Sequence, residues 1–189
     1  GLEHVRPIND EMIDLFVKHK THLNVTTSIY IPKGVQWSKA LWRRLDTEME
    51  SVEQWINLNR ATIQQARRED ALINTQDRPY SLADAPTRQG VDYIPGIKPY
   101  QSQLLKAHRR GVPISVGTDG LHALLLLEIE YLVEAGFSPM EAIQAATRVA
   151  AQGVGWGDKI GTLEPGKLAD IIAVEGNPLE DIRAVQDVL

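Results

Sequence analysis

The sequence contains no cysteine. Disulfide bonds and thiolate metal sites are therefore excluded, and a metal ion in this protein would be bound by His, Asp or Glu. The absence of cysteine says little about the cellular compartment. The chain begins at Gly1 rather than at a methionine, which is compatible with the loss of a leader peptide, and we favour a cytoplasmic location.

An excess of basic charge and a long hydrophobic run are also missing. The formal net charge is -5, so we expect no basic face that binds nucleic acid. The longest nearly apolar run, residues 121–129, contains His122 and Glu128 and is far too short to span a bilayer. With 189 residues, 43% of them hydrophobic, the chain is long enough for one well-cored globular domain without a membrane partner.

A short apolar segment followed by a glycine-rich turn is the most informative local feature. Residues 114–116 predict a buried strand, and the Gly-Thr-Asp-Gly turn of residues 117–120 ends it. This turn leaves Asp119 at the carboxyl end of the strand. In parallel α/β folds, that edge of the sheet carries catalytic and metal-binding residues.

The elements around this strand follow from capping and periodicity signals. Residues 2–4 resemble the end of a strand, Asn9 precedes an amphipathic helix over residues 10–20, and β-branched residues predict a strand over residues 21–31, which together indicate a βαβ order. Further helices are predicted over residues 100–110, 123–135 and 139–150, the last opened by a Ser138–Glu141 capping box, and another strand over residues 168–174.

A long connection separates the second predicted strand from the following helix. Residues 33–99 begin with a polar, largely helical stretch that contains Trp37, Trp42 and Trp55, and end in an irregular stretch rich in proline and glycine. A connection of this length is usually functional, for example as a lid. The tryptophans could line a pocket, although packing is their commoner role.

Two ionisable residues end strands on what should be the same rim, His4 and Asp119. Imidazole and carboxylate could share a divalent metal such as zinc. For a lone histidine, however, a structural role is the commoner one, and for an aspartate after Gly-Thr a turn or cap role is as common as a functional one. His122 follows the turn and should lie near the rim. We expect structural roles for His19 and His108 at helix ends, and for His22, which should face solvent.

Several motifs resemble the amidohydrolase superfamily. They are residues 160–172 (IGTLEPGKLADII) continued by residues 174–181, residues 116–119 (VGTD), residues 1–4 (GLEH), and residues 128–146. The last segment is similar to the imidazolonepropionase and Xaa-Pro dipeptidase-like branch. The resemblance implies the C-terminal part, strands six to eight, of a (β/α)8 barrel over residues 1–155, with part of a small β-sandwich over residues 156–189.

The resemblance also implies a chemistry. His4 and Asp119 would bind one or two divalent metal ions, commonly zinc, and Asp119 would act as general base on the attacking water. His122 and Tyr30 would contact the substrate. The superfamily's other metal ligands, from strands one, four and five, are not in this sequence. This absence predicts that the chain is part of a longer enzyme and packs against the remainder of its own barrel.

The leading interpretation is therefore a metal-dependent amidohydrolase of the peptidase or dipeptidase type, acting on a small N-acyl or dipeptide substrate. A deaminase or cyclic-amide hydrolase of the same superfamily is an alternative, because His4 and Asp119 serve those reactions too. A catalytically inactive binding or assembly module is the alternative from another class. A homo-oligomer is expected in each case.

Overall fold

The computed structural model describes residues 1–4, 8–27, 97–118 and 125–189. The predicted insertion over residues 33–99 lies outside the described residues, except for residues 97–99 at the start of a helix. Its three tryptophans, and the predicted site residues Tyr30, Asp119 and His122, also lie outside.

The chain opens with a strand, a helix and a second strand, as the sequence predicts. These are β1 (Leu2–Glu3), α1 (Asp10–Lys18) and β2 (Leu23–Val25). The side chain of Asn9 accepts a hydrogen bond from the backbone N–H of Met12 at 2.9 Å, which satisfies a donor that the first helical turn leaves without an intrahelical partner. This confirms the predicted N-cap.

The third strand completes a parallel sheet. Helix α4 (Ile97–Arg109) leads into β3 (Ile114–Val116), and the three strands lie in the order β1-β2-β3 with parallel pairing throughout. The register aligns Leu2 with Leu23 and Ile114, and Glu3 with Asn24 and Ser115. The α/β class and the parallel sheet are thus confirmed. Helix α4 begins before the predicted residue 100, because Pro99 is tolerated in a first helical turn.

Three helices follow the sheet: α5 (Leu125–Glu134), α6 (Pro139–Ala146) and α7 (Arg148–Gly153). Gly136, at a φ of 103°, ends α5 as predicted, since a left-handed residue after a helix is usually glycine. Ser138 and Glu141 form the predicted capping box at the start of α6. The predicted helix over residues 139–150 is divided at Thr147, whose φ and ψ of -122° and -94° are not helical.

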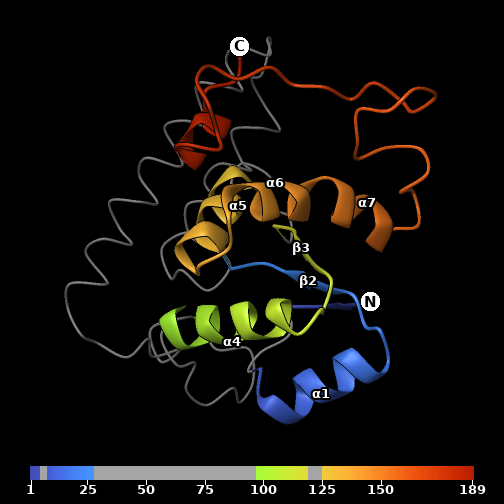
Figure 1. The fold of residues 1–189 in the computed structure, drawn as a ribbon, viewed down its shortest axis with the longest axis vertical. Coiled ribbons are helices and arrows are strands. Elements are labelled where there is room, and N and C mark those ends of the chain that lie inside the picture. Colours follow the sequence, from blue (N-terminus) through green and yellow to red (C-terminus); the bar gives the residue numbers. More distant parts are fainter. Residues whose placement is uncertain (5–7, 28–96, 119–124) are drawn as a thin grey trace, which may run out of the picture.

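The core lies between the sheet and the helices. Figure 1 shows α5, α6 and α7 above the strands and α4 and α1 below them. Leu23 and Val25 of β2 and Ile114 and Val116 of β3 belong to one buried apolar cluster with side chains from α1, α4, α5 and α6. Alternation along the strands directs Asn24 and Ser115 to the opposite face of the sheet.

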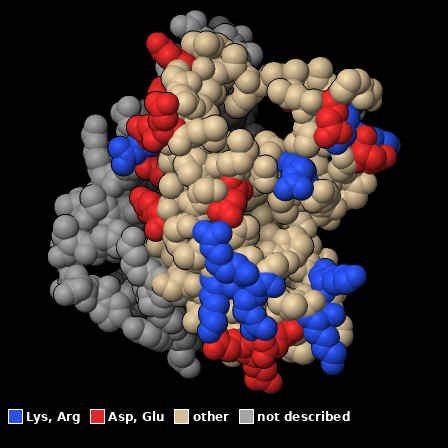
Figure 2. Space-filling view, in the orientation of Figure 1, with Lys and Arg blue, Asp and Glu red and all other residues tan. Residues whose placement is uncertain are grey.

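The outer surface of α1 and α4 is charged. Figure 2 shows Lys and Arg side chains next to Asp and Glu side chains over this part of the molecule. Lys106 Nζ of α4 lies 2.7 Å from Asp10 Oδ1, and Nη1 of Arg110, the residue that follows α4, lies 2.6 Å from Asp14 Oδ1. Surface ion pairs thus join α1 to α4 and to the residue after it. None of the helices among the described residues has the length and hydrophobicity that a membrane-spanning helix requires.

The C-terminal residues run away from the core and then return to it (Figure 1). The strand predicted over residues 168–174 is wrong: these residues are irregular, apart from one antiparallel bridge between Val174 and Val188. A β-branched sequence becomes a strand only where a neighbouring strand completes the ladder. The chain returns in the short 3-10 helix η4 (Ile182–Gln186), which buries Ile182 and Val185 in the core cluster.

Candidate functional site at the carboxyl ends of the strands

His4 directly follows β1 and has an unusual backbone conformation. Its backbone N–H donates to the carbonyl oxygen of Asn24 at 3.2 Å, which continues the pairing with β2. Its φ is 55°, in the left-handed region that residues other than glycine rarely adopt. The regular alternation of side chains therefore ends at this residue. Such outliers persist only where the surrounding structure holds them, and they gather at functional sites.

The His4 ring is held by a buried hydroxyl group. Nδ1 of His4 lies 2.6 Å from Oγ1 of Thr26, a residue that is 1% exposed just beyond the end of β2. The other ring nitrogen, Nε2, lies 3.8 Å from Oε2 of Glu3. The ring is one-third exposed, so it lies at the edge of the described sheet and within reach of solvent.

A fully buried carboxylate supports the same rim from α5. The backbone N–H of Thr27 donates to Oε2 of Glu128 at 2.7 Å, between residues 101 positions apart in the chain. Glu128 has 0% exposure, and ionisable groups are buried to this extent only with partners. No role was predicted for Glu128 from the sequence. An acidic residue inside the otherwise apolar run of residues 121–129 was the signal that could have identified it.

A metal ion at this rim would need further ligands besides His4. Among the described residues, no group of three His, Asp or Glu side chains is placed to bind a metal. His4 nevertheless has what a ligand histidine needs, since histidines that bind metals usually have their second ring nitrogen fixed by another group. The described donor, an imidazole at the carboxyl edge of a parallel sheet, is of the type that zinc prefers.

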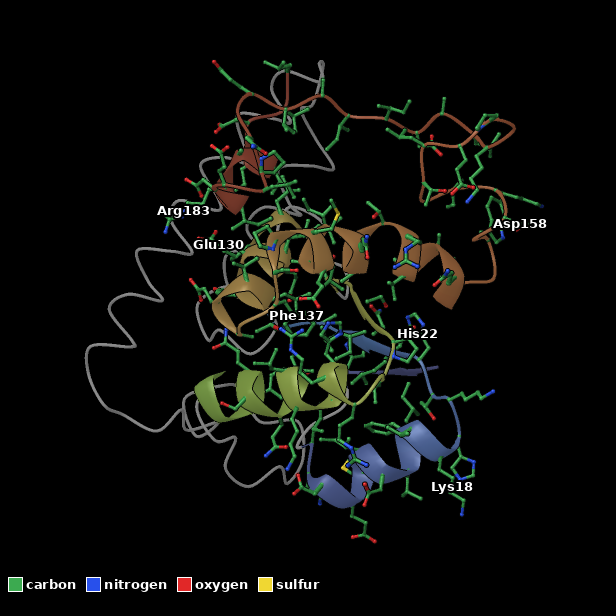
Figure 3. All side chains as sticks on the ribbon, viewed as in Figure 1. Lys18, His22, Glu130, Phe137, Asp158 and Arg183 are labelled. Carbon is green, nitrogen blue, oxygen red and sulfur yellow. The ribbon has the colours of Figure 1, made fainter. Side chains whose placement is uncertain are left out.

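His22 lies at the opposite, amino end of β2. It was predicted to face solvent, and this prediction is wrong. Its ring is partly buried and Nε2 lies 2.8 Å from Oγ of Ser115, which donates to Oδ1 of Asn24 at 3.1 Å. An added Cβ at Gly153 would lie 2.6 Å from His22 Nε2, so the end of α7 covers the ring closely (Figure 3). Burial lowers the pKa of His22 below its ordinary value of 6.5.

His108 and His19 have the structural roles expected of them, by different contacts. His108 stacks on Phe137 with ring centroids 4.4 Å apart, and its Nε2 lies 3.0 Å from Oε1 of Glu141. The Ser138 backbone N–H and the His108 ring together lower the pKa of Glu141 to about 2. His19 is exposed and ends α1.

A comparison with the sequence profiles of known protein families identifies the family of this chain. The profile of the amidohydrolase family matches residues 7–188, nearly the whole chain. The chain belongs to the amidohydrolase family. Members of this family are generally metal-dependent.

The similarity of this amidohydrolase chain to individual relatives is partial. It is 42% identical over 94 residues to ochratoxinase of Aspergillus niger, which is 48% of this chain and 19% of that protein. It is 43% identical over 67 residues to imidazolonepropionase of Aromatoleum aromaticum, which is 32% of this chain and 16% of that protein. The chain therefore matches less than a fifth of the length of these relatives.

Solved structures share its fold over almost all of the chain. A Xaa-Pro dipeptidase with bound methionine in the active site matches with a TM-score of 0.57 and 28% identity, over 98% of this chain and 36% of that one. A prolidase complexed with N-methylphosphonate-L-proline has a similar fold, with a TM-score of 0.59 and 22% identity over 99% and 38% of the two chains. The three parallel strands of the amidohydrolase chain thus correspond to part of a larger fold.

Proposed function

We propose that this amidohydrolase chain is the C-terminal part of a metal-dependent hydrolase that cleaves an amide or peptide C–N bond in a small substrate, such as a dipeptide or an N-acyl amino acid. The observation that carries the proposal is His4, which lies at the carboxyl end of a parallel strand, in a left-handed conformation, with one ring nitrogen 2.6 Å from a buried hydroxyl. The likeness to the Xaa-Pro dipeptidase supports the substrate class.

In this proposal each of the four predicted site residues has its own role. His4 and Asp119 would hold a divalent metal, which we propose to be zinc, and the remaining ligands would come from other strands of a (β/α)8 barrel. A divalent metal at this position would lower the pKa of a water and polarise the scissile carbonyl. Asp119 takes a proton from the attacking water and delivers it to the leaving nitrogen. His122 and Tyr30 contact the substrate.

The arrangement of the chain is part of the same proposal. Residues 1–155 supply strands six to eight of the barrel, with an insertion over residues 33–99, and residues 156–189 contribute to a small β-sandwich. This is supported by the exposure of apolar side chains in the C-terminal segment, among them Leu163, Ile171 and Ile172. Such side chains need a partner surface, which the rest of the protein or a second copy would supply.

A cyclic-amide hydrolase is the second candidate, because the chain is also similar to imidazolonepropionase. A deaminase of the same superfamily is a further form of this candidate. Cleavage of linear and of cyclic amide bonds can be compared directly by offering the whole protein a panel of dipeptides, N-acyl amino acids and cyclic amides. Release of an amino acid from the first two groups supports the leading proposal, and turnover of the cyclic amides alone favours the second candidate.

The test of the reaction itself uses metal analysis, an intact mass and the variant Asp119→Asn. We expect the whole protein to have a mass well above the 21.1 kDa of this chain and to bind one or two metal ions, and the variant to fold but lose turnover. A folded, metal-free wild-type protein without activity on any of the substrates would instead support an inactive binding or assembly module. Retained turnover in folded Asp119→Asn would contradict the role of Asp119.

A further inference from the structure

We propose that Thr26 is a positioning residue for His4, and that the buried carboxylate of Glu128 anchors the end of β2 that carries Thr26. This inference rests on the proposed function, in which His4 binds a metal. It adds two residues that are not metal ligands, and it predicts that replacing either of them lowers the affinity for the metal.

The His4 ring depends on Thr26 for its orientation. A left-handed φ of 55° is unfavourable for a residue with a Cβ, so contacts elsewhere must stabilise the conformation. The contact between His4 Nδ1 and Thr26 Oγ1, at 2.6 Å, is such a contact. When Nδ1–H donates to this hydroxyl, Nε2 carries the lone pair that can bind a metal, and the bond fixes both the tautomer and the plane of the ring.

Thr26 is itself held rigidly. A threonine has few accessible side-chain rotamers, and Thr26 is almost completely buried, so its hydroxyl has little freedom to move. The backbone on both sides is fixed as well. The Val25 carbonyl accepts from the Gly117 N–H at 2.8 Å, and the Thr27 N–H donates to Glu128 at 2.7 Å.

Glu128 fixes the backbone next to Thr26. A hydrogen bond from a backbone N–H to a carboxylate is stronger than one between neutral groups, and burial away from water strengthens it further. Glu128 ties α5 to β2, and β2 carries the hydroxyl that meets His4. Displacing the β2 end by a fraction of an ångström would therefore move the His4 ring.

The test of Thr26 compares three variants of the whole protein in Zn²⁺ titrations against a competing chelator. Thr26→Val replaces the hydroxyl by a methyl group of similar size, and we expect the Zn²⁺ affinity to fall about 10- to 100-fold. Thr26→Ser keeps the hydroxyl and should restore most of the affinity. Ser115→Ala is the matched control. It removes another buried hydroxyl that contacts an imidazole, but this hydroxyl lies on β3 and its partner, His22, lies at the amino end of β2. We expect it to leave the affinity unchanged.

The test of Glu128 uses its neighbour Glu130 as the control. Both carboxylates are buried on α5, but Glu130 accepts hydrogen bonds from η4 rather than from the β2 end. Glu128→Ala should weaken Zn²⁺ binding about 10-fold or more, as loss of an outer-shell partner does, while Glu130→Ala should not. Glu128→Gln keeps an acceptor oxygen at the same place, and recovery of affinity in this variant separates positioning from a general loss of packing.

The outcomes separate this inference from the proposed function. If His4→Ala lowers the bound zinc while Thr26→Val binds Zn²⁺ as tightly as Ser115→Ala does, the metal site stands and the positioning role of Thr26 is overturned. Equal losses in Glu128→Ala and Glu130→Ala would likewise overturn the role of Glu128. If His4→Ala leaves the metal stoichiometry unchanged, His4 is no ligand and the proposed function fails with the inference.

Discussion

Leu2 and Leu23 are aligned in register on neighbouring parallel strands, yet Leu2 is 45% exposed and Leu23 is fully buried. Leu23 packs in the core cluster that the sheet shares with the helices. Leu2 lies on β1, one of the two edge strands of the described sheet, and outside that cluster. The contrast gives a matched pair of leucines on the same face of one sheet.

We expect Leu23→Ala to lower the free energy of unfolding by about 2–5 kcal/mol, because it removes buried methyl groups and leaves a cavity. Leu2→Ala should cost about 0.5 kcal/mol or less, as surface substitutions usually do. Urea denaturation of the two variants measures both values. Equal losses would show that β1 is as well covered as β2 in the protein in solution.

A second prediction concerns acid stability. The pKa of Glu141 is lowered to about 2 by the Ser138 backbone N–H and by His108, below its ordinary value of 4.5. The unfolded chain therefore binds more protons between these values, so the stability from this group is present above pH 4.5 and is lost as the pH falls toward 2. We expect Glu141→Gln to flatten the stability profile in this window.

Ser138→Ala isolates the capping box from the ion pair of Glu141 with His108. Loss of a serine N-cap should lower the free energy of unfolding by about 1 kcal/mol at pH 7. Denaturation curves recorded from pH 2 to 7 measure both variants. A wild-type profile that is flat below pH 4.5 would contradict the lowered pKa of Glu141.

A third prediction concerns His22, whose pKa is lowered by burial. The folded protein keeps this ring neutral at pH values where the unfolded chain has already protonated it. Stability should therefore fall as the pH drops below 6.5, in a window above that of Glu141. The difference in unfolding free energy between pH 7.5 and pH 5.5 should shrink in His22→Gln. An NMR titration of His22 that gives its ordinary pKa would contradict this explanation.

A fourth prediction concerns the contact between Glu130 and η4. Glu130 accepts from Arg183 Nε at 3.2 Å and from Gln186 Nε2 at 3.1 Å, and Figure 3 shows Glu130 and Arg183 directed toward each other. Glu130→Ala should cost about 1–3 kcal/mol, because it leaves a buried amide donor without its acceptor. Arg183 is mostly exposed, so Arg183→Ala should cost about 1 kcal/mol at most.

Hydrogen exchange provides the second measurement for this contact. In Glu130→Ala, the amides of residues 182–186 should exchange faster, while those of β2 and β3 should keep their protection. Faster exchange throughout the sheet would mean that η4 is required for the whole core and is not a local attachment.

The features that the sequence predicted correctly depend on groups close together in the chain. The Asn9 cap, the Ser138–Glu141 box and the turn at Gly136 each involve residues within a few positions of one another. Their hydrogen bonds and backbone angles are therefore encoded locally. The strand over residues 114–116 was also predicted with its observed bounds, because its apolar run has clear ends.

The candidate site was predicted only in part, because its contacts join residues that are far apart in the chain. His4 was identified at a strand end, but neither its left-handed backbone nor its contact with Thr26 follows from the residues around it. His22 was expected to face solvent because nothing near it in the sequence indicates Ser115 and α7 as neighbours. The predicted roles of Asp119, His122 and Tyr30 stay predictions.

The sequence by itself determined the family, the α/β class, the helix caps at Asn9 and Ser138 and the histidine after the first strand, because these depend on short motifs and local periodicity. The tertiary structure alone decided that Glu128 supports the end of β2 across 101 residues of chain, and that residues 168–174 form no ladder. Both outcomes depend on which distant surfaces meet. A carboxylate can be buried only where the fold supplies a hydrogen-bond donor, and a segment can form a strand only where another strand lies beside it.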